Sequence, residues 1–332
     1  MFPQWLRYLV IAMVAVSLSW ARAFGSSPVE DRLLRMVPAN AEIVAGIEDP
    51  HHGDQSGRLL LVTHSNNVDL NDWLTLAGVD DRREVDKLVE VALSSPRGEL
   101  SEHLLLVQGS FNGRFILDSA ERNGGVPSSY QGVRVVIVAP FPRERQEMPD
   151  TRWLAIVDDN TVIFGTPAVA KRVLERYVSR SEADSQLMKR LKELKPDVNC
   201  WSVLTMPGAV LTSHLRAGVL DDAGTRLLRR VSGVAIGVHY GLKERVDFAL
   251  SADSPEIATA LAASLGDQLH LLRVAGALQT HFEDVSVEQN EVRGSVRVKG
   301  KEFDSWLAAV YARLSMGGGV RGDEVARAGG VR

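Results

Sequence analysis

Three stretches of this chain repeat one pattern: an apolar strand, a short polar turn, a second apolar strand and a segment with helical spacing. The strand pairs are expected at residues 153–157 and 162–164, 234–240 and 246–250, and 282–287 and 292–298. A two-stranded hairpin is only marginally stable alone, so one of its faces must pack on another element. An amphipathic helix can cover that face, and adjacent units then build antiparallel sheets with helices packed on one face. The pattern predicts an α+β fold and suggests a degenerate internal duplication.

The helical segments that follow these hairpins carry their own signals. Thr166-Pro167 and Ser254-Pro255 each supply a capping residue and a proline at the first helical position. The third segment has the strongest helical periodicity in the chain, because its apolar residues are spaced three and four apart. They are Phe303, Trp306, Leu307, Val310, Tyr311 and Leu314.

The first half of the chain has the same character with weaker periodicity. Apolar runs predict strands at residues 42–47, 104–107 and 133–138 and in the second half of 85–93. Helices are expected at residues 29–36, 114–122 and 185–194, and residues 128–130 are interpreted as a polar lead-in to a strand. A break after residue 195 would divide the mature chain into two α+β domains, 24–195 and 196–315, followed by a disordered Gly-rich tail at 316–332.

Composition excludes several classes of protein. The chain has 332 residues, is 45% hydrophobic and 24% charged, and carries a net charge of −4, which is ordinary globular usage. The acidic balance argues against a nucleic-acid partner. Basic groups on helix surfaces, such as Lys189 to Lys192, are interpreted as solvated faces.

The first 23 residues predict an export signal. Arg7 precedes an apolar run at residues 8–20, and Ala21-Arg22-Ala23 offers the small-residue pattern that signal peptidase cleaves. The run is shorter than the roughly 20 residues that a membrane-spanning helix needs. We therefore expect a periplasmic or secreted protein. The alternative is an uncleaved N-terminus that anchors the chain to the inner membrane, facing the periplasm, and this is the only route to a membrane that the sequence offers.

The sequence contains one cysteine, Cys200. An exported chain with a single cysteine cannot form an internal disulfide, so its stability must come from burial. Cys200 begins an apolar stretch, which predicts a buried and inert thiol.

Reactive groups are sparse. The densest set of metal-ligating residue types is the loop with His51, His52 and His64, where acidic residues lie close by. It has no regular zinc-ligand spacing, so these three histidines are the metal candidates and a solvated loop is the favoured interpretation. Nucleophile elbows and phosphate-binding glycine loops are missing from the sequence. We therefore expect no cofactor and assign no catalytic residue.

Residues 33–41, Leu-Leu-Arg-Met-Val-Pro-Ala-Asn-Ala, lead into the apolar run Ile-Val-Ala-Gly-Ile at 43–47. This opening resembles an uncharacterised family of exported bacterial proteins of the acidobacterial type, with a domain of unknown function. The resemblance implies export and carries no activity, so no residue inherits a role from it.

The function favoured by these observations is an exported, non-enzymatic binding or scaffold protein in the bacterial envelope. Its partner would be an unknown envelope protein or a small ligand, and its oligomeric state stays open. The main alternative is a metal-dependent or other hydrolase whose site converges only in the fold. A carrier of amphipathic ligands is a third interpretation, and a large apolar cavity would be its signature.

Overall fold

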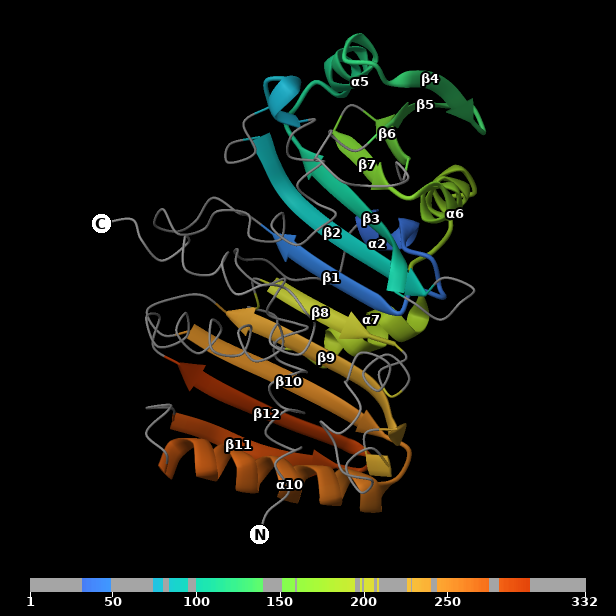
Figure 1. Ribbon diagram of the computed structural model, residues 1–332. Helices are drawn as coiled ribbons and strands as arrows, with labels where there is room; N and C mark the ends of the chain where they lie inside the picture. The colour runs from blue at the N-terminus through green and yellow to red at the C-terminus, as the bar shows by residue number, and fades with distance from the viewer. Residues whose placement is uncertain are drawn as a thin grey trace, which may run out of the picture.

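One twisted antiparallel sheet runs through the part of the protein that the structure describes (Figure 1). The structure is a computed structural model that describes residues 32–48, 74–79, 84–94, 100–139, 151–158, 160–194, 198, 200–205, 208, 226–227, 229–239, 244–274 and 281–298. Its twelve strands lie in the order β11-β12-β10-β9-β8-β1-β2-β3-β7-β6-β5-β4. The α+β composition and the antiparallel pairing expected from the sequence are therefore confirmed, in a single continuous sheet.

The first half of the chain supplies seven of these strands. The helix α2 (Arg32–Met36) precedes a three-stranded meander of β1 (Ile43–Glu48), β2 (Val85–Ser94) and β3 (Leu100–Gly109). The helix α5 (Gly113–Arg122) then leads to β4 (Val126–Tyr130), β5 (Val133–Val138), β6 (Arg152–Asp158) and β7 (Thr161–Gly165), and β7 returns to pair with β3. Two helices follow, α6 (Pro167–Val178) and α7 (Ser185–Lys192).

The second half follows a similar order with fewer strands. The meander β8 (Cys200–Leu204), β9 (Val231–His239) and β10 (Glu244–Ala252) leads into α10 (Pro255–Val274). The hairpin of β11 (His281–Glu288) and β12 (Glu291–Val298) comes next, and β12 pairs with β10 as β7 pairs with β3.

The two halves meet where β1 pairs antiparallel with β8. The register of this seam joins Ile43 to Leu204 at one end and Ile47 to Cys200 at the other. The break expected after residue 195 lies between α7 and β8, and the sheet is continuous across it through the seam.

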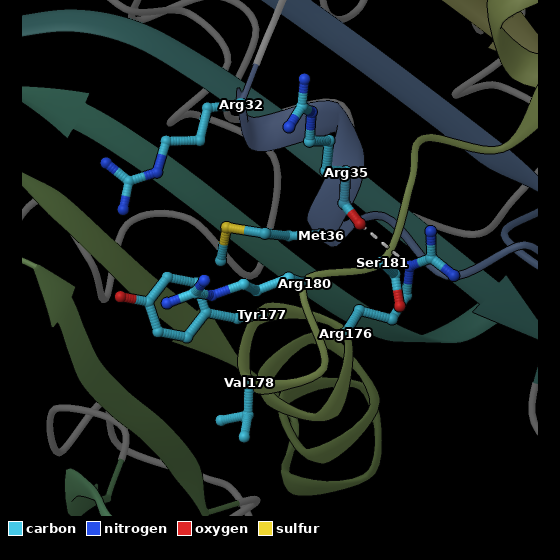
Figure 2. A pocket seen from close by; sticks show the side chains of 8 residues that line it. All are labelled: Arg32, Arg35, Met36, Arg176, Tyr177, Val178, Arg180 and Ser181. Atoms are coloured by element: carbon cyan, nitrogen blue, oxygen red, sulfur yellow. Dashed lines mark hydrogen bonds between the residues drawn. The ribbon is translucent and has the colours of Figure 1, made fainter.

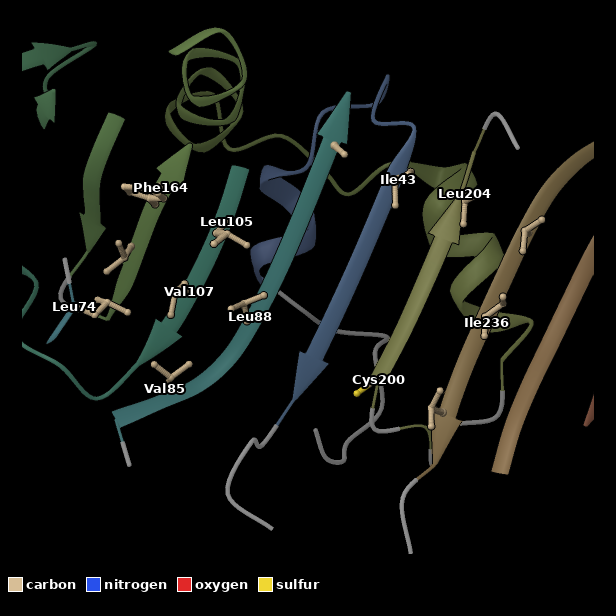
Figure 3. Packing of buried hydrophobic residues seen from close by; sticks show 14 of the residues in the cluster. Ile43, Leu74, Val85, Leu88, Leu105, Val107, Phe164, Cys200, Leu204 and Ile236 are labelled. Carbon is tan, nitrogen blue, oxygen red and sulfur yellow. The ribbon is translucent and has the colours of Figure 1, made fainter. Parts of the chain in front are cut away.

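Each face of the sheet carries its own hydrophobic core. On one face, strand residues such as Leu105 and Phe164 pack with α5 and α10, and part of this core is drawn in Figure 3. On the opposite face, alternate strand residues such as Leu104 and Ile163 pack with α2, α6 and α7. We call these the α5/α10 face and the α2/α6/α7 face.

The expectation that the helices pack on one face is therefore wrong. β7 and β8 are buried along their whole length, so their side chains on both sides need cover. Strands that are buried on both faces read as continuous apolar runs, and helices are then required on each side of the sheet.

Most of the expected elements are present where the structure describes them. The hairpins β6–β7, β9–β10 and β11–β12 are confirmed, and the first two are followed by the expected helices α6 and α10. Residues 128–130 are not a lead-in, because they belong to the edge strand β4, which pairs with β5. The export signal, the helix expected after β12 and the Gly-rich tail lie outside the described residues.

Within the described ranges, no helix is long and apolar enough to cross a membrane.

Candidate anion-binding site

Four arginines, from α2 and from the C-terminal end of α6 and the turn after it, line one cavity of about 450 Å³ on the α2/α6/α7 face (Figure 2). We call this cavity the arginine pocket. The described residues that line it are Arg32, Arg35, Met36, Arg176, Tyr177, Val178, Arg180 and Ser181.

The helix α2 supplies two of the arginines because of its spacing. Leu33 and Leu34 are fully buried against the sheet, so Arg32 and Arg35, three residues apart, project from the opposite side of the helix. Pro38 follows shortly after the end of the helix and prevents its continuation.

The other two arginines lie at the C-terminal end of α6, with Arg176 in its last turn and Arg180 just after the cap residue Ser179. Val173 and Leu174 are completely buried, which anchors the last turns of the helix to the sheet. Tyr177 is held near the end of β6, because its hydroxyl donates a 2.5 Å hydrogen bond to the carbonyl of Val157. Arg176 and Arg180 therefore emerge beside α2, against which α6 packs.

The end of α6 has an unusual residue in its capping motif. The Ser181 N–H donates to the Arg176 carbonyl at 3.0 Å and the Arg180 N–H donates to the Tyr177 carbonyl at 3.2 Å, which is the Schellman pattern. The position after the cap then adopts a left-handed conformation that glycine usually fills. Here it is Arg180, with φ of 52°. This conformation costs a residue with a Cβ roughly 1–2 kcal/mol.

The four guanidinium groups differ in what they contact. Arg176 is structural, because its Nε donates to the Arg35 carbonyl at 3.1 Å and its Nη2 donates to the Glu182 carbonyl. Arg32 forms an ion pair with Asp158, whose Oδ2 lies 2.6 Å from Nη2. Within the part of the chain that the structure describes, the guanidinium groups of Arg35 and Arg180 have no acceptor.

The direction of the side chains separates these groups further. In Figure 2, Arg32 and Arg180 extend toward the same side of the cavity as the Tyr177 hydroxyl, whereas the guanidinium of Arg35 points away beside α2. The Arg32 side chain is 54% exposed, whereas the Asp158 side chain is 22% exposed and the oxygen that faces Arg32 is buried. A guanidinium has five N–H donors, so Arg32 can donate to a ligand while its Nη2 stays paired with Asp158.

Positive charge dominates the pocket. Among the residues that the structure describes, the lining includes no carboxylate, histidine or cysteine, and Asp158 is paired with Arg32. A guanidinium presents a planar fork of N–H donors that matches the oxygens of a carboxylate or a phosphate. The arrangement is therefore suited to hold a small oxyanion between Arg180 and Arg32.

A second polar cluster lies between α7 and the strands of the second half. Arg190 of α7 is mostly buried, donates to Ser251 on β10, and lies 3.3 Å from Glu193. Burial, together with the negative charge of Glu291 on β12, raises the pKa of Glu193, although Arg190 opposes this. Arg190 therefore does not belong to a solvated face, which corrects the expectation for that residue, whereas Lys189 and Lys192 are exposed as expected.

Burial also raises the pKa of Glu291, but hydrogen bonding to Arg293 and the charge of that arginine outweigh it and leave the pKa lowered. The two carboxyl groups influence each other, so their pKa values move apart: that of Glu193 is raised and that of Glu291 is lowered. Arg190 and Arg293 flank the pair, which makes this cluster a bridge between α7 and the sheet.

The residues singled out from the sequence do not form a site in the described structure. His51, His52 and His64 lie outside the described residues. Among the residues that the structure describes, no group of three or more His, Cys, Asp and Glu could hold a metal ion. Cys200 is a free thiol with 1% exposure, which confirms the buried cysteine.

Two further groups lie on the same face as Cys200 without meeting it. His103 on β3 is 3.5 Å from the buried carboxylate of Glu90 on β2. β1 and β2 separate Cys200 on β8 from His103, a span of roughly 14 Å at about 4.8 Å between neighbouring strands. The thiol and this imidazole therefore cannot act as a catalytic pair.

Sequence reasoning missed the arginine pocket. Its signal was the helical spacing of Arg32 with Arg35 and of Arg176 with Arg180, but the two pairs are more than a hundred residues apart. Only the packing of α2 on α6 brings them together.

Comparison of the chain with protein-family models finds no match, and no curated protein and no solved structure matches it.

Proposed function

We propose that this chain is an exported, non-enzymatic binding protein of the bacterial envelope, and that its ligand is a small oxyanion bound in the arginine pocket. The observation that carries the proposal is that four arginines line one cavity of about 450 Å³ and that two of them, Arg32 and Arg180, extend toward the same side of it. The leader predicted at residues 1–23 and the resemblance of residues 33–47 to exported bacterial proteins support the proposed location in the envelope.

The lining of the pocket favours binding over catalysis. General acid–base chemistry needs a histidine, a carboxylate or a similar group within hydrogen-bond reach of the reacting atoms. The cavity offers guanidinium groups, one phenol, one serine hydroxyl and two apolar side chains. The Tyr177 hydroxyl already donates to a backbone carbonyl, and Ser181 is hydrogen-bonded to Ser179 at 2.8 Å.

Titration calorimetry with inorganic phosphate tests the anion site. We expect saturable binding at one site, weakened at least about tenfold in Arg180→Gln and in Arg32→Gln, because each removes one charged donor. Arg172→Gln is the matched control, because Arg172 is an exposed arginine of α6 that does not line the cavity. Unsaturable heats, or equal losses in the control, would refute the site.

The mature N-terminus tests the location. Mass spectrometry of the protein from the envelope fraction should find Phe24 as the first residue if the leader is cleaved after Ala23. An intact leader in a membrane fraction would support the anchored form, and recovery from the cytoplasm would contradict export.

We also propose that the two halves of the sheet descend from one duplicated unit. The support is their common order: a three-stranded meander, a helix on the α5/α10 face, and a last strand that returns to the third strand of the meander. Superposing β1, β2 and β3 on β8, β9 and β10 should bring α5 onto α10. A superposition that placed these helices on opposite faces would contradict a duplication.

A further inference from the structure

We infer that the ligand of the arginine pocket joins an oxyanion to an apolar body, as an organic phosphate does. This inference rests on the proposed function and narrows it. It follows from the size of the cavity, from the apolar side chains that line it, and from the conformation of Arg180.

The cavity is too large for an inorganic anion alone. A water molecule occupies about 30 Å³ in the liquid, whereas the cavity measures about 450 Å³. Sites for small organic molecules begin at roughly 300 Å³. An oxyanion between Arg180 and Arg32 would therefore leave most of the space for the remainder of a larger molecule.

The remaining lining suits an apolar group. Met36, Tyr177 and Val178 border the same cavity as the arginines. Val178 is the last residue of α6 and is 46% exposed, so it is one of five exposed large apolar side chains among the described residues. A hydrocarbon or aromatic body that covered Val178 would remove this apolar surface from water.

The conformation of Arg180 points to a role in binding rather than in stability. The structure describes three residues other than glycine with positive φ, and Gln131 and Gln289 both lie in short turns between paired strands. Arg180 instead occupies the helix-ending position for which glycine is the favoured residue. Strained backbone of this kind is concentrated at ligand sites, and here it holds a guanidinium without a described partner at the cavity.

Two sources could supply this ligand chemistry: a soluble organic phosphate, or the phosphate of a lipid headgroup with its acyl chains. Both place an oxyanion beside an apolar body, so the pocket residues would act in the same way on each. The experiment therefore has one arm for each source.

Titration calorimetry of the full mature chain compares phenyl phosphate with inorganic phosphate. We expect phenyl phosphate to bind at least about tenfold more tightly, because its ring buries apolar surface. Val178→Ser should reduce that advantage, because Val178 is one of the apolar side chains that border the cavity, and it should weaken the binding of phenyl phosphate more than that of inorganic phosphate. Val126→Ser is the matched control, because Val126 is another exposed valine, on the edge strand β4 and away from the cavity.

The variant Arg180→Gly distinguishes a role of Arg180 in ligand binding from a role in the stability of the fold. Its urea midpoint should be no lower than that of the wild type, while its affinity for both phosphates falls at least about tenfold. A clearly lower midpoint would show that Arg180 serves the helix end, and would overturn the argument from its conformation. Equal affinities for the two phosphates would contradict the inference that the ligand has an apolar body, but would not contradict the anion site. If neither phosphate binds, both the inference and the proposed anion site are wrong.

The second arm measures sedimentation with phosphatidylglycerol vesicles and with phosphatidylcholine vesicles. Binding to phosphatidylglycerol that is lost in Arg180→Gly assigns the lipid headgroup as the source. Tight binding of phenyl phosphate without vesicle binding assigns a soluble organic phosphate. Vesicle binding that is the same in Arg180→Gly, with no preference for phenyl phosphate, would contradict the inference.

Discussion

The central strand β1 contains a glycine that the indole of Trp201 lies against, and replacing it with alanine should destabilise the seam between the two halves. Gly46 pairs with Trp201 on β8 and with Val89 on β2. A Cβ added at Gly46 would lie 2.2 Å from Cζ2, 2.3 Å from Cε2 and 2.8 Å from Nε1 of Trp201. Carbon atoms in good contact are about 3.5–4.0 Å apart, so the ring would have to move by more than about 1 Å.

The expected loss follows from the burial of that ring. Trp201 is 4% exposed and belongs to the core of the α2/α6/α7 face, so it has little room to move. Inserting a methyl group into a packed core costs about 1–3 kcal/mol, and a rigid ring places this case in the upper part of that range. Gly→Ala also restricts the unfolded chain, which returns about 0.4–1 kcal/mol. The free energy of unfolding should therefore fall by about 2 kcal/mol in Gly46→Ala.

Urea unfolding followed by far-ultraviolet circular dichroism measures this change without relying on tryptophan fluorescence. A double-mutant cycle with Trp201→Phe assigns it, because the smaller ring leaves space for the new methyl group. In the Trp201→Phe background the same glycine substitution should cost less than about 0.5 kcal/mol. Ser202→Ala is the control for disturbance of the seam: the Ser202 hydroxyl is buried with no hydrogen-bond partner in the described structure, so its removal should be neutral or stabilising.

Two results would refute this reasoning. An unchanged stability in Gly46→Ala would mean that the seam accommodates the methyl group by moving β1. Equal losses in the wild-type background and in the Trp201→Phe background would mean that the indole is not the obstacle.

Three further predictions concern single interactions. The raised pKa of Glu193 means that the folded protein binds more protons than the unfolded chain, so the wild type should lose stability as the pH rises from about 4 through that pKa. Glu193→Gln should remove this loss. Urea midpoints measured against pH check the prediction, and an identical slope in both proteins contradicts it. Hydrogen bonding to Glu175 raises the pKa of Tyr130, so Glu175→Gln should lower that pKa in a spectrophotometric titration. Tyr130→Phe identifies the absorbance change that belongs to Tyr130. An unchanged pKa would exclude the hydrogen bond between Tyr130 and Glu175. Asn112→Ala should cost about 1 kcal/mol in urea unfolding, because its side chain accepts from the Phe115 N–H at the start of α5. Thr166→Ala should cost less, because Thr166 makes no side-chain cap bond on α6, and a reversed order would contradict this argument.

The hairpins could be predicted from the sequence because each carries a local signal. The turn between β6 and β7 is an example: the Asn160 N–H donates to the Asp158 side chain at 2.9 Å, as expected for an Asp in a tight turn. Apolar runs on either side of such a turn define the two strands without any knowledge of distant contacts.

The edge strand β4 was missed for a physical reason. Its sequence, Val-Pro-Ser-Ser-Tyr, has neither alternation nor an apolar run, and Pro127 argues against a central strand. A proline is tolerated there because β4 pairs only with β5 and leaves its other edge unpaired within the described sheet.

The arginine pocket could not be predicted, because it depends on contacts between segments far apart in the chain. The hydrogen bond from Arg176 to the Arg35 carbonyl spans 141 residues. Helical spacing can indicate which side of a helix an arginine occupies, but not that the sides of two distant helices meet. The side chains that define a binding cavity are set by tertiary packing, whereas hairpins and helices are set locally.

The position of β1 in the sheet has a consequence for synthesis of the chain. β1 is made before the other described strands, yet one of its two neighbours, β8, begins only about 150 residues later. At translation rates of roughly 5–20 residues per second, that delay is about 8–30 seconds. During this interval the emerging polypeptide presents an open strand edge in the middle of its future sheet, where a second nascent chain could pair with it. Mispairing at this open edge is therefore a hazard of this architecture until β8 has been synthesised and has paired with β1.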